Sequence, residues 1–407
     1  MARRVFLHIG TPKSATTYIQ DSLWPNRHEL RALGIQVPLA HQGSHWRVGI
    51  HARTLGIDGG RTFPVEFKRF LDRVNEWEGD IVLSTEILCA INPKQVKLFV
   101  ESIPCDEVHV IITARDFVRQ VTAEWQQHVK GGVSRSLEEF IADIRKRDSS
   151  LWFWKVQDLD AITRRWASVI PVERIHLVTV PKTSADPELV WKRFCGVLGV
   201  DPARVPPRNG QSNVSLGFPQ TESLRLLNRW RIENGMAPGD AESKLYRSVK
   251  FFAPLRESKG PKIQIPVEDQ EWAKSIGEEM VGNIQSRGVN IVGSVEDLDS
   301  FVLPASANTP LSLDGFVEII TPILHDSLLR LERANEKNRT WKTELDLTRE
   351  KMELKIDNHV VEIARQKEVI SGLRDELERR STIRGGLSTI KGGIKRRLKG
   401  LFRRSAA

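Results

Sequence analysis

The stretch that most constrains this chain lies near its start, at residues 5–20, where an apolar run turns within a few residues into a helical pattern. Residues 5–9 have the compact apolar composition of a buried parallel strand. Pro12 breaks that run, and Ile19 and Leu23 are then spaced one helical turn apart. A strand that leads directly into a helix leaves several backbone N–H groups pointing into the turn. Together with the helix dipole, these groups can bind an anion such as a phosphate.

The side chains of this turn also favour an anion. Lys13 supplies a mobile positive charge, and the hydroxyl groups of Ser14, Thr16 and Thr17 supply hydrogen-bond donors. The alternative is an ordinary strand–turn–helix corner that happens to contain a lysine. Because charge and donors occur together at the end of a strand, we interpret the turn as a site for a nucleotide phosphate.

Residues 12–17 of this turn read Pro-Lys-Ser-Ala-Thr-Thr. They do not form the nucleoside-triphosphate loop G-x-x-x-x-G-K-[ST], because Pro12 and Leu7 stand where its two glycines should be. They resemble instead the P-K-[ST]-G-T-T element of sulfotransferases that use 3′-phosphoadenosine 5′-phosphosulfate (PAPS), with Ala15 in place of the family's usual Gly. The resemblance implies a PAPS site that includes Thr11, Lys13, Ser14, Ala15, Thr16 and Thr17.

A second element follows a strong strand pattern at residues 108–113 and begins with Arg115-Asp-Phe. It resembles the R-[DN]-P-x-x-R-x-x-S element of the same sulfotransferases, in which the Arg and the Ser bind the 3′-phosphate of PAPS. The resemblance gives these roles to Arg115 and Thr122, although Phe117 replaces the Pro and a strict count puts Ala123 in the place of the Ser. A permanently charged guanidinium and a hydroxyl at a helix start suit a phosphate dianion. Taken alone, Arg115 would be expected to pair with a nearby carboxylate.

Strand patterns alternate with helical patterns along most of the chain. This alternation predicts an α/β fold with a mostly parallel sheet and helices on both faces, which the sulfotransferase (P-loop-like) resemblance also implies. Strands are expected at residues 5–9, 35–38, 81–84, 108–113, 174–180 and 289–292. Ligands of such sheets bind at the carboxyl ends of the strands, where the first turn, Glu86 and Arg115 all fall. Residues 191–199 and 209–217 resemble the late region of bacterial sulfotransferases, so the resemblance covers roughly the first three-quarters of the chain.

Sulfuryl transfer builds negative charge on the leaving phosphate and removes a proton from the acceptor. Lys13 is the candidate to stabilise that charge. The candidates for the base are Glu86, at the end of a central strand, and His45, in an expected loop after the second strand, with Glu86 favoured. Glu86 has an alternative role as a structural partner of Lys13 or Arg115, and His45 as an ordinary loop residue. The sequence shows no metal cluster, and this chemistry requires none.

The acceptor is expected to be a hydroxyl of a carbohydrate, a glycolipid or another small molecule. Aromatic residues could form a wall against such an acceptor, although most tryptophans at such spacings belong to a core. The candidates for this wall are Trp46, Trp125, Trp152, Phe153 and Trp154.

Two other functions remain open. A nucleotide or small-molecule kinase would also place its phosphate loop after the first strand, but it predicts a glycine directly before Lys13 and a pair of magnesium-binding carboxylates. A non-catalytic adaptor with a degenerate sulfotransferase fold is a different class, and Ala15 and Phe117 are the features that favour it.

The net charge of +9 is concentrated at the C-terminus. Residues 379–407 carry ten Lys and Arg and no acid, so subtracting ten from +9 leaves −1 for the rest of the chain. Three scattered cysteines do not suggest a disulfide framework or a zinc site, and no apolar run has the length of a membrane span or a signal peptide. We expect a cytoplasmic protein.

Four parts are expected along the chain: a sulfotransferase-like domain at 1–300, a linker at 301–323, a coiled coil at 324–378 and a basic amphipathic tail at 379–407. The coiled coil is predicted from a heptad seam, which implies a homo-oligomer; the alternative is a long helix packed on its own domain. Its apolar members are Leu324, Leu328, Leu331, Leu345, Met352, Ile356, Ile363, Ile370, Leu373 and Leu377. Polar residues interrupt this seam at Asn335, Asn338, Lys342, Arg349, His359 and Gln366.

The basic tail has a second amphipathic pattern, in which apolar residues share one helical face. These residues are Leu387, Ile390, Ile394, Leu398 and Leu401. Such a helix can lie on an anionic membrane, with each basic residue contributing about 1 kcal/mol. The tail therefore predicts peripheral attachment at the inner membrane face. The alternatives are a solvated basic tail or one that touches nucleic acid without specificity.

Overall fold

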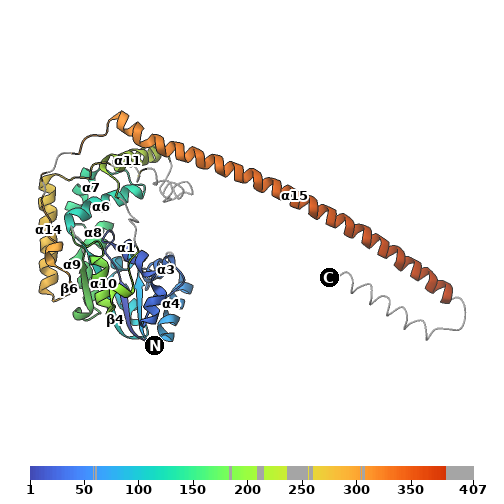
Figure 1. Cartoon of the computed structure of the whole chain (residues 1–407), viewed down its shortest axis with the longest axis horizontal. Helices are drawn as coiled ribbons and strands as arrows, with labels where there is room; N and C mark the ends of the chain where they lie inside the picture. The colour runs from blue at the N-terminus through green and yellow to red at the C-terminus, as the bar shows by residue number, and fades with distance from the viewer. Residues whose placement is uncertain are drawn as a thin grey trace. The chain divides into compact units, whose positions relative to one another are not determined.

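The computed structural model describes residues 1–57, 59, 62–182, 186–208, 215–235, 255, 260–302, 304 and 308–381 (Figure 1). The chain divides into a compact unit, Met1–Asp326, and a second unit, Ser327–Ala407. The compact unit contains the sheet, the expected site and most of the helices. The 209–214 part of the late resemblance and the tail beyond residue 381 lie outside the described residues, so membrane attachment through that tail stays a prediction.

The compact unit is built on one six-stranded sheet in which every strand is parallel to its neighbours. The order across the sheet is β2-β3-β1-β4-β5-β6. The strands are β1 (Ala2–His8), β2 (Ile35–Gln36), β3 (Asp80–Ser84), β4 (Cys105–Ala114), β5 (Ile175–Thr179) and β6 (Asn290–Val292). All six coincide with expected strands, which confirms the predicted α/β class with a parallel sheet.

Strand β1 lies in the middle of the sheet, with Val5 opposite Ile81 of β3 on one side and Val108 of β4 on the other. From β1 the chain continues towards β2 at one edge, whereas from β4 it continues to β5 and the opposite edge. The order of the strands therefore reverses between β1 and β4. In open parallel sheets, ligands bind at such a reversal, beyond the carboxyl ends of the two strands. The two motifs expected to bind nucleotide follow these two strands.

Helices cover both faces of the sheet, because successive strand residues point to opposite sides. Phe6, Val82, Ile111 and Val178 face one side and pack with three helices. These are α1 (Thr16–Leu23), α2 (Arg27–Ala32) and α10 (Leu189–Leu198). The other face, with Leu7 and Val110, packs with a larger set. That set comprises α3 (Gln42–Ala52), α4 (Pro64–Glu76), α5 (Pro93–Glu101), α6 (Phe117–Lys130), α7 (Leu137–Arg145), α8 (Trp152–Gln157), α9 (Leu159–Ala167), α11 (Phe218–Glu233) and α14 (Val267–Ser286).

Two segments differ from the sequence-based expectation. Residues 41–60 were expected to form a loop, but α3 occupies Gln42–Ala52 and buries Val48 and Ala52. Gly49 allows this helix to approach β3, because a Cβ there would lie 3.0 Å from the side chain of Thr85. The buried side of α3 carries small and polar residues, among them Ser44, His45 and Gly49, so no apolar stripe marks the helical period in the sequence.

The last helix, α15, runs from Leu313 to Ser381 and is 69 residues long. The long C-terminal helix is confirmed, although it begins inside the segment expected as a linker. Its first turns belong to the compact unit, where Ile319 and Ile323 are buried in the core. Among the helices that the structure describes, none has the length and apolar character needed to cross a membrane.

His8, the last residue of β1, joins three strands at the centre of the sheet. Its ring is 1% exposed; Nδ1 lies 2.8 Å from the Ser84 hydroxyl of β3, and Nε2 lies 3.3 Å from the Thr113 hydroxyl of β4. Burial disfavours the charged ring and lowers its pKa from 6.5 to about 3. The neutral ring is therefore part of the folded structure at neutral pH.

We predict that acid destabilises the protein through His8. The unfolded chain takes up this proton below pH 6.5 but the folded chain only near pH 3, so the contribution is fully present above pH 6.5 and is lost as the pH falls towards 3. Between pH 7 and pH 5 the loss should be about 2 kcal/mol. Urea unfolding of His8→Gln should show a shallower fall over this range. The same substitution at exposed His28 should keep the wild-type slope, and equal slopes for all three proteins would refute this account.

Candidate functional site

The turn between β1 and α1 has an unusual backbone. Gly10, Lys13 and Ala15 have φ angles of 63°, 64° and 64°, whereas Ser14 between the last two does not have a positive φ. At Gly10 a side chain is excluded, because a Cβ would lie 2.6 Å from the Thr16 methyl group. Ala15 caps α1 in the left-handed conformation, at the position where the resembling family usually has Gly. The left-handed conformation is one that glycine adopts without strain, so it agrees with a preference for Gly at this position. Ala15 adopts the same conformation at a cost of roughly 1 kcal/mol in conformational free energy.

Hydrogen bonds fix this turn to the end of β4. The Thr11 N–H donates to the Thr113 carbonyl at 2.8 Å, and the Ser14 hydroxyl lies 2.8 Å from both the carbonyl and the hydroxyl of Thr113. The Ser14 side chain is fully buried. Its hydroxyl therefore points into the protein and holds the turn, so the Ser14 side chain is not available to a ligand.

The backbone N–H groups of residues 13–18 have no acceptor among the described residues, while the next one, Ile19, donates to the Ala15 carbonyl at 3.1 Å. The N–H groups of Thr16, Thr17 and Tyr18 are those that the first turn of any helix leaves without a partner. Thr16 is buried and Thr17 is half-buried. Unpaired donors beside the positive end of the α1 dipole are chemically suited to an anion, which makes this turn a candidate anion site.

Two cations flank the turn without forming ion pairs to any described carboxylate. The Lys13 ammonium donates to the Gln127 side-chain oxygen at 2.5 Å. Arg115, directly after β4, donates to the Gln120 side-chain oxygen at 2.6 Å and to the Arg119 carbonyl at 2.7 Å. The neighbouring carboxylate, Asp116, caps α6 and pairs with Arg119 instead. The surface pair that Arg115 would make in isolation is therefore absent from the described structure.

Both cations are partly removed from water. Burial lowers the pKa of Arg115 to about 10, so the group stays charged at neutral pH. Burial also lowers the pKa of Lys13, while the charges of Glu124 and Glu86 oppose that shift. A desolvated cation interacts more strongly with an anion than one in water. The arrangement favours a ligand that brings negative charge.

Sequence reasoning missed the polar network beneath the turn. Gln120 of α6 and Gln157 of α8 both donate to the Pro12 carbonyl, the latter at 3.2 Å, and Gln157 also donates to Glu124 at 2.9 Å. Glu124 is only 2% exposed, and burial raises its pKa, against the opposing charges of Lys13 and Arg115. The available signal was the helical spacing of polar residues after Arg115, at positions 120, 124 and 127.

Thr122 occupies a different face of α6 from this network. Thr122 is two positions after Gln120, which places it about 160° around the helix from Gln120, whereas Ala123 is about 60° away. The Thr122 hydroxyl donates to the Arg119 carbonyl at 3.1 Å, three residues earlier. The structure thus brings Arg115 to the turn together with Gln120. The position that a strict count of the motif assigns to the Ser is occupied by Ala123, which has no hydroxyl.

The two base candidates lie in different environments. Glu86 begins the short 3₁₀ helix η1 (Glu86–Ala90) after β3, is half-buried and accepts from Gln20 of α1 at 3.2 Å. It borders the turn, because its Cβ would be 3.2 Å from a Cβ on Gly10. The structure therefore places Glu86 beside the turn, near enough for its charge to oppose the lowering of the Lys13 pKa.

His45 lies in α3 and is fully buried. Its Nδ1 accepts from the Ser84 N–H at 3.1 Å, and its Nε2 donates to the Pro38 carbonyl at 2.6 Å. Burial lowers its pKa to about 4. The two ring nitrogens thus link α3 to the Pro38 carbonyl and to Ser84 of β3. Neither nitrogen is free to take a proton from a ligand.

The aromatic residues considered for an acceptor wall separate into two groups. Trp125, Phe153 and Trp154 are at most 4% exposed and belong to the core. Trp46 and Trp152 are exposed, and the Arg53 guanidinium lies 5.0 Å from the Trp152 ring centre. Only these two could contact a ligand from solution.

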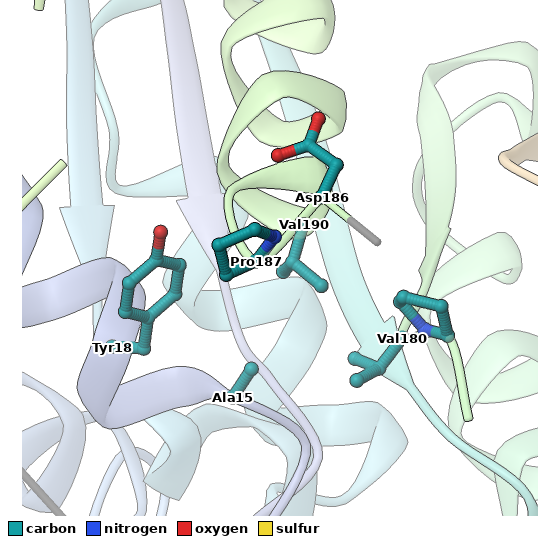
Figure 2. Close-up of a pocket in the computed structure, with 7 residues that line it drawn as sticks. Ala15, Tyr18, Val180, Asp186, Pro187 and Val190 are labelled. Carbon is teal, nitrogen blue, oxygen red and sulfur yellow. The ribbon is translucent and has the colours of Figure 1, made fainter. Parts of the chain in front are cut away.

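A pocket of about 270 Å³ adjoins the turn through Ala15. In Figure 2 the ring of Tyr18 and the side chain of Val180 stand on opposite sides, with Pro187 and Val190 between them. The pocket is formed where α1 begins, where β5 ends and where α10 approaches. Its mainly apolar walls, with one aromatic ring, suit a flat apolar group attached to an anion in the turn. Its remaining lining residues are Pro181 and Asp186.

Comparison with models of known protein families gives no match, and comparison with curated proteins gives none either. In the described part of the chain, no group of three or more His, Cys, Asp or Glu is arranged to hold a metal ion. The fold therefore defines a class only: an α/β protein with a six-stranded, all-parallel sheet. Lys13 and Arg115 follow the two strands between which the strand order reverses, where ligands of such sheets bind.

We predict that Ala15→Gly stabilises the protein by about 0.5–1 kcal/mol, because glycine removes the strain of a positive φ and offsets its own extra unfolded-state entropy. Chemical denaturation measures the change. Ala123→Gly provides the matched control, since it lies inside α6, where glycine costs about 1 kcal/mol. If Ala15→Gly lowered the free energy of unfolding as Ala123→Gly does, the inferred backbone strain at Ala15 would be wrong.

Proposed function

We propose that the protein is a PAPS-dependent sulfotransferase that transfers a sulfuryl group to a hydroxyl of a carbohydrate, a glycolipid or another small acceptor. The observation that carries the proposal is the juxtaposition of two sequence elements at one place. The turn with Lys13 and the segment with Arg115 lie beyond neighbouring strands at the reversal of strand order, and Gln120 hydrogen-bonds to both.

The residues present fit the charges of PAPS. The unpaired N–H groups of residues 13–18 and the Lys13 ammonium suit the 5′-phosphosulfate. The Arg115 guanidinium, which has no described carboxylate partner, suits the 3′-phosphate. The pocket beside Ala15 suits the nucleoside, because its apolar walls and the ring of Tyr18 can pack against a flat base. In this proposal Thr122 contributes no hydroxyl to the phosphate.

When bound, PAPS supplies the sulfuryl group, whose bond to the phosphate oxygen breaks as the bond to the acceptor oxygen forms. Lys13 stabilises the charge that develops on the leaving phosphate, at a fixed position held by Gln127. Glu86 is the proposed base that receives the acceptor proton, because it borders the turn, whereas both nitrogens of His45 are engaged. The acceptor would then approach from the Glu86 side of the turn.

Binding of the desulfated product tests the nucleotide site. We predict that Arg115→Ala weakens binding of adenosine 3′,5′-bisphosphate about 10–100-fold, because it removes a charge-assisted contact to the 3′-phosphate. Binding of adenosine 5′-phosphate should change by less than about threefold. Calorimetric titration of both nucleotides measures this difference, and Arg73→Ala, at an exposed position of α4, serves as the control. Equal losses for the two nucleotides would place Arg115 elsewhere, and no binding by the wild type would refute the proposed function.

Turnover tests the chemistry. With labelled PAPS and an acceptor found by screening cell extracts, Glu86→Gln should lower kcat by about 100-fold or more while the Kd for adenosine 3′,5′-bisphosphate stays the same. Lys13→Ala should lower kcat by a similar factor, because it removes charge stabilisation from the leaving group. A Glu86→Gln enzyme with wild-type kcat would exclude this base. A protein that binds the nucleotide tightly but transfers no label would instead support the adaptor.

A further inference from the structure

The part of α15 beyond the compact unit, residues 327–376, presents an apolar seam to solvent. Seven of its seam residues are between 44% and 69% exposed: Leu328, Leu331, Leu345, Met352, Ile356, Ile363 and Ile370. With steps of three and four residues, these fall at heptad positions a and d, where Leu328, Ile356, Ile363 and Ile370 are at a. The seam therefore runs along one face of the helix.

The described residues of this helix segment do not show the packing that normally stabilises a helix. Residues 327–381 span about 80 Å at 1.5 Å per residue. Most helical stability in proteins comes from burying an apolar face, and an isolated helix is marginal in water. The seven seam residues named above are exposed among the described residues, and a single helix cannot bury its own apolar face. A stable helix of this length requires a partner along the seam.

The seam is complementary to a second copy of itself. β-branched residues at a favour two parallel strands, and the late heptads have Ile356, Ile363 and Ile370 at a. Their d positions are apolar at both ends, Met352 and Leu373, and polar at His359 and Gln366 between them. Asn335 also lies at a, where an asparagine faces its own counterpart in a parallel pair and fixes the register.

Charges at the edge of the seam agree with this arrangement. Glu362 is at heptad position g and Lys367, five residues later, is at e. In a parallel, in-register pair these two residues of different copies face each other, and the contact occurs twice. Arg349, a cation at a, already pairs with Glu353 of its own helix at 3.2 Å, so its head group is directed to the edge and its stem can pack in the seam.

We propose that residues 327–376 bind a second copy of this chain as a parallel, in-register, two-stranded coiled coil, held most tightly from Met352 to Leu373. The inference is independent of the proposed function. The earlier heptads, with Asn335, Asn338 and Lys342 in the seam, contribute register more than affinity.

The mass of the full chain in solution tests the proposal. Sedimentation should show a dimer for the wild type, and Ile363→Asp, which puts a charge at a, should weaken association at least 100-fold. Val361→Asp is the matched control, because Val361 is also β-branched and 68% exposed but lies at f, outside the seam. A monomeric or higher-order wild type, or equal effects of the two substitutions, would overturn the proposal.

Cross-linking tests the orientation. Leu373→Cys places one thiol at d near the end of the segment, where a parallel, in-register pair brings the two copies together. Mild oxidation should give a disulfide-linked dimer, whereas Val361→Cys should not. The wild type, with buried Cys89 and Cys195 and half-buried Cys105, reports any background. A dimeric Leu373→Cys protein that fails to cross-link would exclude the parallel, in-register arrangement.

Discussion

The site depends on the hydrogen bonds that join the turn after β1 to Thr113 at the end of β4. One backbone carbonyl accepts from both Thr11 and Ser14, and Arg115 follows only two residues later. The N–H groups of the turn and the Arg115 guanidinium, which are proposed to bind the ligand, are therefore held at a fixed separation by the sheet itself, without help from a long loop. The two sequence elements, around Lys13 and Arg115, lie far apart in the chain but form a single rigid structure because β1 and β4 are neighbours.

Neutral amides, rather than carboxylates, hold the two cations. Gln127 accepts from Lys13 and Gln120 accepts from Arg115, so each cation is oriented while its charge remains available to a ligand. The one deeply buried carboxylate nearby, Glu124, accepts from Gln157. A carboxylate in direct contact would orient the cations equally well but would compete with an incoming phosphate. This choice of partners explains how a largely buried site can remain electropositive.

The sheet could be predicted because buried parallel strands are continuous apolar runs, as at residues 81–84 and 108–113. The positions of Lys13, Glu86 and Arg115 followed from the rule that such strands place ligands at their carboxyl ends. Helix α3 could not be predicted, because its buried side carries small and polar residues. The bonds of His45 and the network around Glu124 depend on segments far apart in the chain, and no local pattern reports such contacts.

The left-handed backbone at Lys13 and Ala15 has a kinetic consequence. The conformational free energy of this strained backbone is offset when the protein folds, because the sheet and Thr113 hold the turn in shape. A ligand arriving at a preformed turn loses little affinity to ordering of the chain, and encounter need not wait for a loop to close. Association at this turn should therefore be limited by diffusion and charge steering, with discrimination between ligands expressed mainly in how long each one stays.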